Sequence, residues 1–333
     1  TVVIIGLSSK NELNKYIFYA NTKHLVKNIN PYLSASETIY LINRQTSISK
    51  LPKISAGNYT GHALPLSLSD EEKNKLVFEY PESHILFKKL LGSQEFLNGE
   101  IRWCIWISDK QREFAESILP IKQRIEEVKK ARLASKDKSA NNIANRPHQY
   151  RDTKETSTTS VIIPTVSSEI REYIPIGFLP VGTIIKNSAQ AIYYAQPSNF
   201  GILTSKMHMI WVKIIGGKLK TDYRYSAALC YNTFPFPTIS DKQKEQINLH
   251  VFEVLDERAK YPEKTLAQLY DPDKMPAGLK EAHHQLDLAI ERCYRLKPFE
   301  SDTERLEYLF KMYEEMTTKN SLFQKEKKTK KVK

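Results

Sequence analysis

The chain is organised around residues 204–237, TSKMHMIWVKIIGGKLKTDYRYSAALCYNTFPFP. A helical pattern of apolar residues comes first, and Gly216-Gly217 ends it. Beyond the glycines, side chains along a β-strand alternate between two faces. One face is charged and is predicted to carry Lys218, Lys220, Asp222 and Arg224. The opposite face is predicted to pack, and it carries Leu219, Thr221, Tyr223 and Tyr225.

Two interpretations of the charged face stay open from this pattern alone. A charged stripe on a strand is more often a solvated surface than a recognition surface. The alternative is a surface that contacts an acidic partner, and the composition supports it, because the net charge is +12 and the isoelectric point is about 9.3. A protein this basic is expected to bind a polyanion, with nucleic acid as the first candidate and an anionic membrane as the second.

The positive charge is unevenly distributed. Residues 319–333 contain seven lysines and one glutamate, so this segment carries +6 and is predicted to be a disordered basic tail. The rest of the chain carries the other +6. This excess supports nucleic-acid binding by the folded part.

The length of 333 residues allows two or three domains, and 41% hydrophobic with 26% charged residues is typical of a soluble globular protein. No apolar run reaches the roughly 20 residues that a membrane span needs, so a cytoplasmic location is predicted. The three cysteines are far apart and lack CxxC spacing. They therefore indicate neither a disulfide framework nor a zinc site.

Glycine is scarce, with 11 residues in the chain, and the nucleotide-binding patterns GxGxxG and GxxxxGK[ST] are absent from the sequence. Asn30-Pro31-Tyr32 invites comparison with the Asn-Pro-Pro-Tyr motif of amino-methyltransferases, but one proline is missing and a turn is favoured. His283, His284 and Asp287 lack further ligands for a metal. No catalytic, cofactor-binding or metal-binding residue is therefore predicted.

The amino-terminal half is predicted to alternate between strands, helices and irregular segments. Strands are expected at Thr1–Leu7 and Thr38–Ile42. A capping box at Ser69 predicts a helix start, and Asn98-Gly99 predicts a hairpin before an apolar strand with Trp103 and Trp106. A helix over residues 109–134 and a mobile loop over residues 135–160 follow.

The carboxy-terminal half is predicted to change from strands to helices. Residues 160–195 contain four apolar segments separated by turns. Ser198-Asn199 is expected to cap a helix that extends past Trp211, with His208 as a packed residue. After Pro237 three amphipathic helices are expected, which can form a small bundle.

Eight segments, in their order along the chain, resemble a known family. They are LLGSQEF with RWCIWI, SSEIREYIPIGFL, FGILTSKMHMIWV, YRYS with CYNTFPFP, LYDPDKMP, and ERLEYLFKMYEEM. Together they are similar to the carboxy-terminal half of the MmeI-like restriction-modification proteins, which combine a nuclease, an adenine amino-group DNA methyltransferase and a target recognition domain. The resemblance covers nearly the whole chain.

The resemblance implies an α+β fold, in which a mixed-sheet target recognition domain precedes a small all-helical domain. It divides the chain into residues 1–44, the terminal strands of a methyltransferase domain; 45–237, the target recognition domain; 238–318, the helical C-terminal domain; and 319–333, the disordered basic tail.

The resemblance also implies a function, namely sequence-specific recognition of double-stranded DNA for a bacterial adenine DNA methyltransferase. S-adenosylmethionine would be the cofactor of the parent protein and not of this chain. The partners would be double-stranded DNA and the missing methyltransferase and nuclease parts of the same polypeptide. The chain alone is predicted to be inactive.

Side chains before the YRYS-like segment set the base choice in the family, which carries over to Lys218, Lys220 and Asp222. A second position that specifies the base is expected at Lys186 and Asn187. Lysine donates to guanine, asparagine pairs with adenine, and aspartate accepts from the cytosine amine. Three further residues, Arg224, Glu169 and Arg171, are either DNA contacts or members of structural ion pairs. The ion pairs would be Arg224 with Asp222 and Glu169 with Arg171.

Two alternatives come from other functional classes. The chain could be a catalytically active nuclease or methyltransferase in its own right, which labelled cofactor and mixed DNA would reveal. It could also bind single strands or RNA, since 18 tyrosines are available for base stacking. Competition between single strands and duplex distinguishes this second alternative from duplex recognition.

Overall fold

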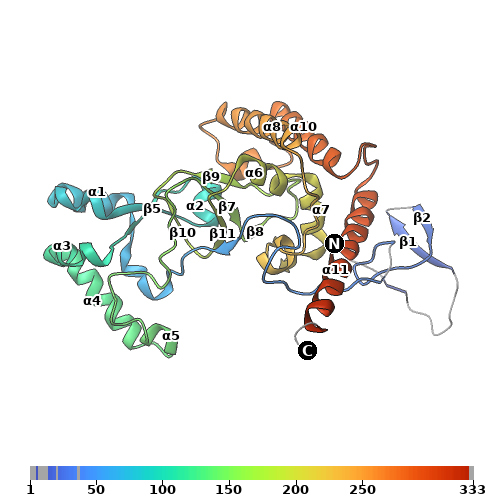
Figure 1. Cartoon of the computed structure of the whole chain (residues 1–333). Coiled ribbons are helices and arrows are strands. Elements are labelled where there is room, and N and C mark those ends of the chain that lie inside the picture. The colour runs from blue at the N-terminus through green and yellow to red at the C-terminus, as the bar shows by residue number, and fades with distance from the viewer. Residues whose placement is uncertain (1–4, 7–13, 20–21, 36–37, 330–333) are drawn as a thin grey trace.

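The computed structural model describes the chain except for residues 1–4, 7–13, 20–21, 36–37 and 330–333. Figure 1 shows three parts in succession: a lobe built mainly from residues 61–155, a central part with β-sheets, and a layer of carboxy-terminal helices. This arrangement confirms the predicted α+β fold with a helical carboxy-terminal region. Within the described residues, none of the helices is both long enough and apolar enough to span a bilayer.

The lobe is built on a four-stranded mixed sheet in the order β10-β5-β6-β4, in which only the β10–β5 pair is parallel. Its strands are β4 (Ser67–Ser69), β5 (Phe87–Leu91), β6 (Arg102–Ile105) and β10 (Ile184–Ile185). Its helices are α1 (Asp70–Glu79), α2 (Ser93–Asn98), α3 (Arg112–Ser117), α4 (Leu119–Leu133) and α5 (Lys138–Asn141). The apolar side of α4 is buried in the core of the lobe through Ile121, Ile125 and Val128.

The start of α1 follows from local sequence, as predicted. The Ser69 hydroxyl accepts a hydrogen bond from the backbone N–H of Glu72 at 3.1 Å, and the Glu72 carboxylate accepts from the Ser69 N–H at 2.8 Å. These two bonds satisfy donors that the first turn of a helix otherwise leaves free.

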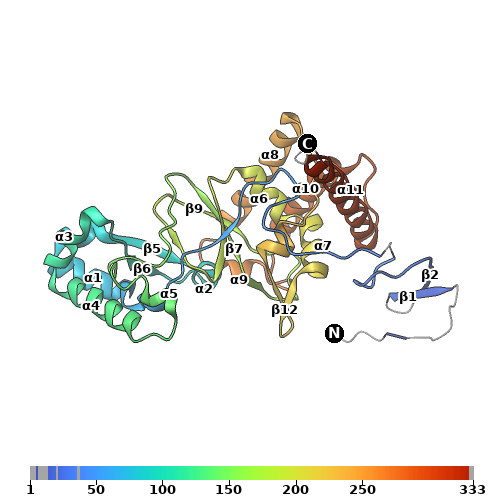
Figure 2. The same ribbon diagram turned by 60° about the horizontal axis from the view of Figure 1, so that its bottom comes forward.

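The central part contains two further sheets (Figure 2). One has the order β3-β11-β7-β9 and is antiparallel throughout, with strands β3 (Ser55–Ala56), β7 (Ser160–Pro164), β9 (Gly177–Leu179) and β11 (Ala189–Tyr193). The other has the order β12-β13-β8, with strands β8 (Val166–Ser167), β12 (Gly217–Leu219) and β13 (Asp222–Arg224). A separate hairpin near the amino terminus pairs β1 (Lys15–Tyr19) with β2 (Thr22–Val26).

The carboxy-terminal helices share one core with the central part. The central part also contains α6 (Pro197–Thr204) and α7 (Lys206–Ile215), and the carboxy-terminal helices are α8 (Asp241–Ala259), α9 (Leu266–Leu269), α10 (Ala277–Tyr294) and α11 (Asp302–Thr329). The fully buried Trp211 of α7 lies beside Phe310 and Tyr313 of α11. Gly201 lets α6 approach α8, since a Cβ there would lie 2.7 Å from the Ile247 side chain. The helical domain is therefore a direct support for the central part.

Two predicted elements differ in the structure, and a third lies mostly outside the described residues. Of the strand predicted at Thr1–Leu7, all but residues 5–6 lie outside the described residues, and those two are irregular. Thr38–Ile42 is irregular instead of a strand, and Tyr40 is 72% exposed, because no described strand pairs with this segment. Asn98-Gly99 is not a hairpin turn, because the preceding residues form α2 and Gly99 ends it with φ 69°.

Two predicted helices are each divided in two. Pro120 lies in the first turn of α4 and cannot donate a backbone hydrogen bond, so the predicted helix over residues 109–134 breaks at Ile118. The predicted helix after Ser198 breaks at Ser205, whose hydroxyl accepts from the His208 N–H and begins α7. The basic segment from Lys319 continues α11 as far as Thr329, where disorder was predicted, because lysine, glutamate and glutamine are good helix formers.

The segment predicted to be a mobile loop, residues 135–160, is instead ordered by long-range hydrogen bonds. The buried Arg132 donates to the carbonyls of Ile143, Arg146 and Gln149 at 2.5–3.0 Å. At the other end of the segment, the fully buried Asn58 accepts from the Lys154 N–H at 2.7 Å. Composition alone predicts flexibility here because it does not include these two organising residues.

Candidate nucleic-acid interface

The charged stretch after Gly216 is a hairpin and not one strand. Leu219 pairs with Asp222 and Lys218 with Tyr223, so Lys220 and Thr221 form a two-residue turn. Lys220 has φ 58°, in the left-handed region that non-glycine residues rarely adopt. Two-residue hairpin turns require such a conformation at one or both central positions. The turn therefore presents Lys220 at the tip of the hairpin.

The single charged face predicted from the sequence is consequently divided between two faces. In an antiparallel pair, residues directly opposite each other lie on the same face. Lys218 thus shares a face with its partner Tyr223, and its Nζ lies 3.6 Å from the centre of that ring. Asp222 and Arg224 lie on the other face, because alternate residues of β13 point the same way. The prediction of one stripe was wrong because strand alternation does not continue through a turn.

The base of the hairpin is fixed by a buried aromatic cluster. Tyr225 is buried, its hydroxyl lies 3.0 Å from the His208 Nε2, and the His208 ring packs edge-on against Phe234 at 4.5 Å. Burial lowers the pKa of His208 to about 3, so the ring is neutral and packed, as the sequence predicted. Gly216 joins α7 to β12, where a Cβ would lie 2.5 Å from the Val212 carbonyl oxygen. The hairpin therefore projects from a rigid support.

Charged residues from the loop after β8 lie beside this hairpin. Burial lowers the pKa of Arg171, and the nearby carboxylates of Asp222 and Asp271 oppose that shift. Burial also raises the pKa of Tyr223, with a further contribution from Glu169. The structure thus brings Glu169 and Arg171 next to β13, although about fifty residues separate them in sequence.

The structural ion pairs considered for these residues are absent. In the part of the chain that the structure describes, Arg224 makes no ion pair with Asp222, and Glu169 makes none with Arg171. Arg224 is exposed on β13, and Arg171 is half-buried. Their guanidinium groups therefore keep donors that a ligand with acidic oxygens can accept from.

The second predicted position lies in the connection between β10 and β11. The Lys186 ammonium forms an ion pair with the buried Glu95 carboxylate, which also accepts from the Gly92 N–H at 2.9 Å. Asn187 is exposed, and its backbone N–H donates to the Asn58 carbonyl at 2.9 Å. Lys186 thus has a structural partner, whereas the side chain of Asn187 faces solvent.

Thr165 connects the turn at Lys186 and Asn187 with the β12–β13 hairpin, a role that sequence reasoning missed. Its hydroxyl donates to the Ser188 carbonyl at 2.5 Å, directly after Lys186-Asn187. Its own carbonyl accepts from the Tyr225 N–H at 2.8 Å, directly after β13. A threonine near a strand end is common, so no local signal indicated this role. Through Thr165 the structure holds the turn at residues 186–188 close to the β12–β13 hairpin.

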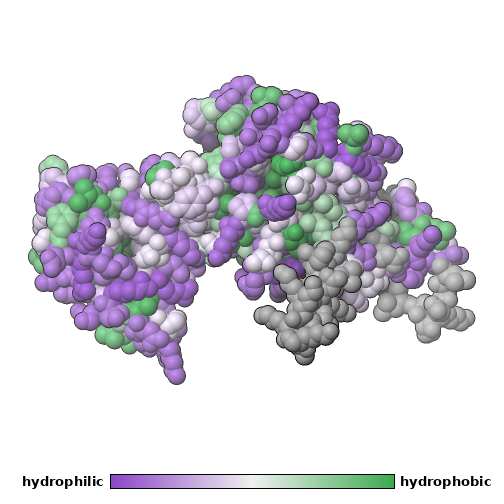
Figure 3. All heavy atoms as spheres, in the orientation of Figure 1, coloured by the Kyte–Doolittle hydropathy of each residue, from purple (hydrophilic) through white to green (hydrophobic). Residues whose placement is uncertain are grey.

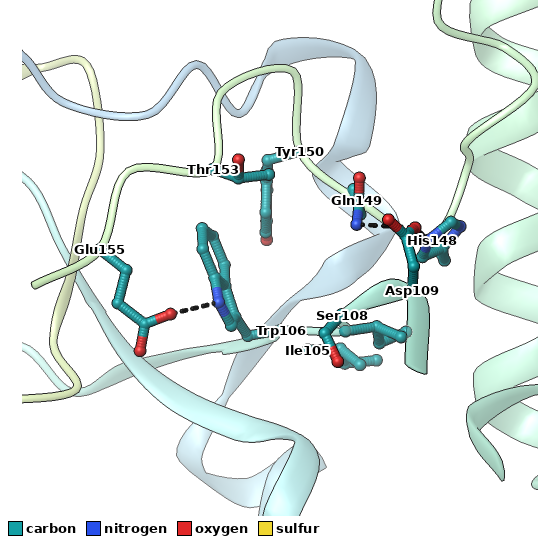
Figure 4. A pocket seen from close by; sticks show the side chains of 10 residues that line it. Ile105, Trp106, Ser108, Asp109, His148, Gln149, Tyr150, Thr153 and Glu155 are labelled. Carbon is teal, nitrogen blue, oxygen red and sulfur yellow. Dashed lines mark hydrogen bonds and ion pairs between the residues drawn. The ribbon is translucent and has the colours of Figure 1, made fainter. Parts of the chain in front are cut away.

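A cavity of about 250 Å³ lies elsewhere, in the lobe (Figure 4). Trp106 stacks on Tyr150 with ring centres 5.9 Å apart and donates its indole N–H to Glu155 at 2.9 Å. On the other side, Asp109 lies 2.8 Å from the His148 Nε2. The nearby Ser108 hydroxyl donates to Gln111 at 2.7 Å and not to this histidine. The cavity therefore holds a histidine–carboxylate pair without an activated nucleophile.

The histidines considered as metal ligands point in different directions. His283 is fully buried, and its Nε2 lies 2.7 Å from the Tyr270 hydroxyl, while His284 is exposed. Across the described residues, no group of three or more histidine, cysteine, aspartate or glutamate side chains could hold a metal ion.

Comparison with protein families gives two adjacent matches. The model of the MmeI target recognition domain matches residues 35–238, and the model of the MmeI C-terminal domain matches residues 239–321. The first match contains the β12–β13 hairpin, the turn at Lys186 and Asn187, and the lobe. The second match contains α8 to α10 and most of α11.

Two relatives match most of this chain. DNA methyltransferase A of Bacillus subtilis (strain 168) is 46% identical over 317 residues, which are 95% of this chain and 36% of that protein. The solved structure of the Type IIL restriction-modification enzyme MmeI in complex with DNA is 36% identical, with a TM-score of 0.86, and the match covers 93% of this chain and 42% of that one. The chain thus spans less than half the length of either relative.

Proposed function

This chain belongs to the MmeI family, and from that premise we propose that it recognises a specific sequence in double-stranded DNA. The supporting observation is the β12–β13 hairpin, which projects a turn with an exposed lysine from a rigid aromatic base. A two-stranded β-ribbon fits the major groove of B-DNA, where lysine and aspartate can distinguish base edges. Lys218, Lys220 and Asp222 are proposed as base contacts, with Asn187 beside them. Lys186, whose ammonium pairs with Glu95, is proposed to position this turn instead of contacting a base.

The parent protein is proposed to be a bacterial restriction-modification enzyme that methylates adenine. The relative named DNA methyltransferase A supports methyl transfer, and S-adenosylmethionine would supply the methyl group. The remaining methyltransferase and nuclease parts of the same polypeptide are proposed as partners of this chain, and the cytoplasm as its location. Arg224 and Arg171 are proposed as additional DNA contacts because their guanidinium groups lack ion-pair partners within the described residues.

The proposal is tested by exchanging residues 220 and 222. In the parent protein, a Lys220→Asp, Asp222→Lys variant is expected to change the methylated DNA motif at one or two positions, while total methylation capacity stays measurable. Sequencing of methylated genomic DNA measures the motif. An unchanged motif would remove these residues from base recognition, and preferential binding of single strands by the wild-type chain would favour the alternative function.

A further inference from the structure

A basic surface lies at the end of the lobe, away from the β12–β13 hairpin and the turn at Lys186 and Asn187. Residues 129–151, here called the basic arm, contain seven lysines and arginines and one aspartate, a net charge of +6. This equals half of the net charge of the whole chain. The arm comprises the end of α4, the short helix α5 and the loop that follows it.

The basic arm is held in one conformation from inside. Arg132 is 1% exposed, and its two terminal nitrogens donate to three carbonyls within the arm, those of Ile143, Arg146 and Gln149. Burial lowers the pKa of Arg132 to about 10, which leaves the guanidinium charged at neutral pH. Asn141 adds a side-chain bond to the Arg132 carbonyl at 2.6 Å. The arm is therefore a preorganised surface, so it loses little conformational entropy when it binds a ligand.

The outer charges of the arm are free to meet a ligand. Lys129, Lys130, Lys136 and Lys138 are exposed, and none of them forms an ion pair with a residue that the structure describes. The one acid, Asp137, accepts from the Ser139 N–H at 2.9 Å and from its hydroxyl. By contrast, Arg124 on the same helix α4 pairs with Glu72 at 2.8 Å.

A structural explanation accounts for only part of this charge. Cations at the end of a helix interact favourably with the helix dipole, which suits Lys129 and Lys130 at the end of α4. Lys136 and Lys138 lie beyond that helix, so the dipole does not explain them. The exposed Asn142 and Asn145 add short side-chain donors next to the lysines.

The position of the arm suits an extended ligand. Figure 1 places α5 at the lower end of the lobe, and Figure 3 shows this end as a hydrophilic projection beside a hollow that separates it from the central part. In Figure 2 the hairpin with β12 projects from the central part, apart from α5. The basic arm and the hairpin are thus two separate projections on one molecule.

We infer that the basic arm binds the phosphate backbone of double-stranded DNA, next to the segment whose bases the β12–β13 hairpin contacts. This inference rests on the proposed function. Lysines and asparagines with freely available donors suit phosphate oxygens and carry no sequence information. An anionic membrane is less suited, because among the larger apolar side chains of the arm only Leu133 is strongly exposed, at 60%.

The test is a comparison of two charge-matched variants of the full chain. In the arm variant, Lys129, Lys130, Lys136 and Lys138 are changed to glutamine. In the control variant, four exposed lysines of the helical domain are changed to glutamine: Lys242, Lys274, Lys280 and Lys297. Duplex affinity is measured against salt concentration, with one specific and one unrelated sequence, and thermal unfolding confirms that both variants fold.

The arm variant is expected to reduce the salt dependence of binding. Each phosphate contact adds about 0.9 to the slope of log affinity against log salt, so the slope should fall by roughly 2 to 4 for both sequences. The ratio of specific to unrelated affinity should stay unchanged, and the control variant should keep the wild-type slope. Equal slopes in the two variants would overturn the inference. It would also be overturned if the arm variant lost binding to anionic phosphatidylserine vesicles while its DNA binding stayed unchanged.

Failure of the inference is distinguishable from failure of the proposed function. If the wild-type chain binds duplex without sequence preference, the proposed function fails, while a reduced slope in the arm variant still supports the phosphate contact. If the wild-type chain prefers one sequence and the arm variant keeps its slope, the function stands and the arm is excluded. If the wild-type chain binds no duplex, both are overturned.

Discussion

Lys186 and Lys220 occupy similar positions in the backbone, but their side chains have different partners. Each lies at the connection between two strands, and each is predicted from the resemblance to contact a base. Lys186 points to the buried Glu95 and forms an ion pair with it. Lys220 is exposed at the tip of a hairpin and makes no ion pair within the described part of the chain. The difference shows that a lysine in a turn acquires its role from what lies across from it.

The pair of Lys186 and Glu95 also ties together distant parts of the chain. Glu95 begins α2 through its bond to the Gly92 N–H, and 91 residues separate it from Lys186. Despite its burial, hydrogen bonds and the Lys186 charge lower the pKa of Glu95. Lys186 therefore contributes to the fold of the interface, while Lys220 is available to a ligand.

At a fixed pH, the largest effect is expected from breaking the buried pair of Lys186 and Glu95. Lys186→Ala leaves the Glu95 carboxylate buried without a cation, and should lower the free energy of unfolding by about 3 kcal/mol, the lower end for a buried pair because Lys186 is partly open to water. Urea unfolding measures the change, with Lys89→Ala on the exposed face of β5 as the control. If Lys186→Ala leaves the stability unchanged but alters the DNA sequence preference, Lys186 contacts DNA and is not a structural residue.

Asp287 is a buried carboxylate without a paired cation among the described residues, and its pKa is shifted in the opposite direction to that of Glu95. Burial raises the pKa of Asp287 to about 7, although the Lys206 N–H and the Tyr173 hydroxyl donate to it at 2.7 Å. Between pH 4 and 7 the folded protein keeps a proton that the unfolded chain has released. The stability from this group is therefore complete at low pH and is lost as the pH rises through 7.

Asp287→Asn should remove this dependence. Over that pH range the wild type is expected to lose up to about 1.4 kcal/mol per pH unit from this group relative to the variant. Chemical unfolding at several pH values measures the difference between the two proteins. Parallel curves for wild type and variant would mean that Asp287 is ionised throughout the range.

Lys220→Ala should change DNA discrimination without changing stability. Loss of one base contact reduces discrimination at a single base pair by about 1–3 kcal/mol. Binding to a set of duplexes that differ at one position measures it, and Lys242→Ala on α8 is the control for lost charge. If affinity falls equally for every duplex, Lys220 contacts the backbone and not a base.

The smallest effect concerns the backbone of the hairpin turn. Lys220→Gly and Lys220→Ala remove the same charge, but glycine adopts φ 58° without the steric cost of a Cβ. The glycine variant should therefore be more stable than the alanine variant by about 1 kcal/mol. Thermal unfolding of the two variants side by side provides the measurement. Equal melting temperatures would indicate that the turn relaxes when the lysine is removed.

Local sequence was sufficient where the deciding groups are close together in the chain. The Ser69 capping box joins two residues three positions apart and predicts the start of α1. Ser240 with Gln243 forms the same motif at the start of α8. The spacing of Ile121, Ile125 and Val128 indicates the buried side of α4 because helix periodicity is a local property. The same reasoning failed at Asn98-Gly99, where one dipeptide suits both a hairpin turn and a helix end.

The sequence by itself determined the α+β class, the main helices, the basic charge and the family. Only the tertiary structure decided which charges are available. It divided the predicted charged face of residues 218–224 between the two faces of a hairpin, gave Lys186 a buried partner, and ordered residues 135–160 around Arg132. The physical reason is that burial and pairing depend on residues far apart in the chain, whereas caps and periodicity depend on neighbours.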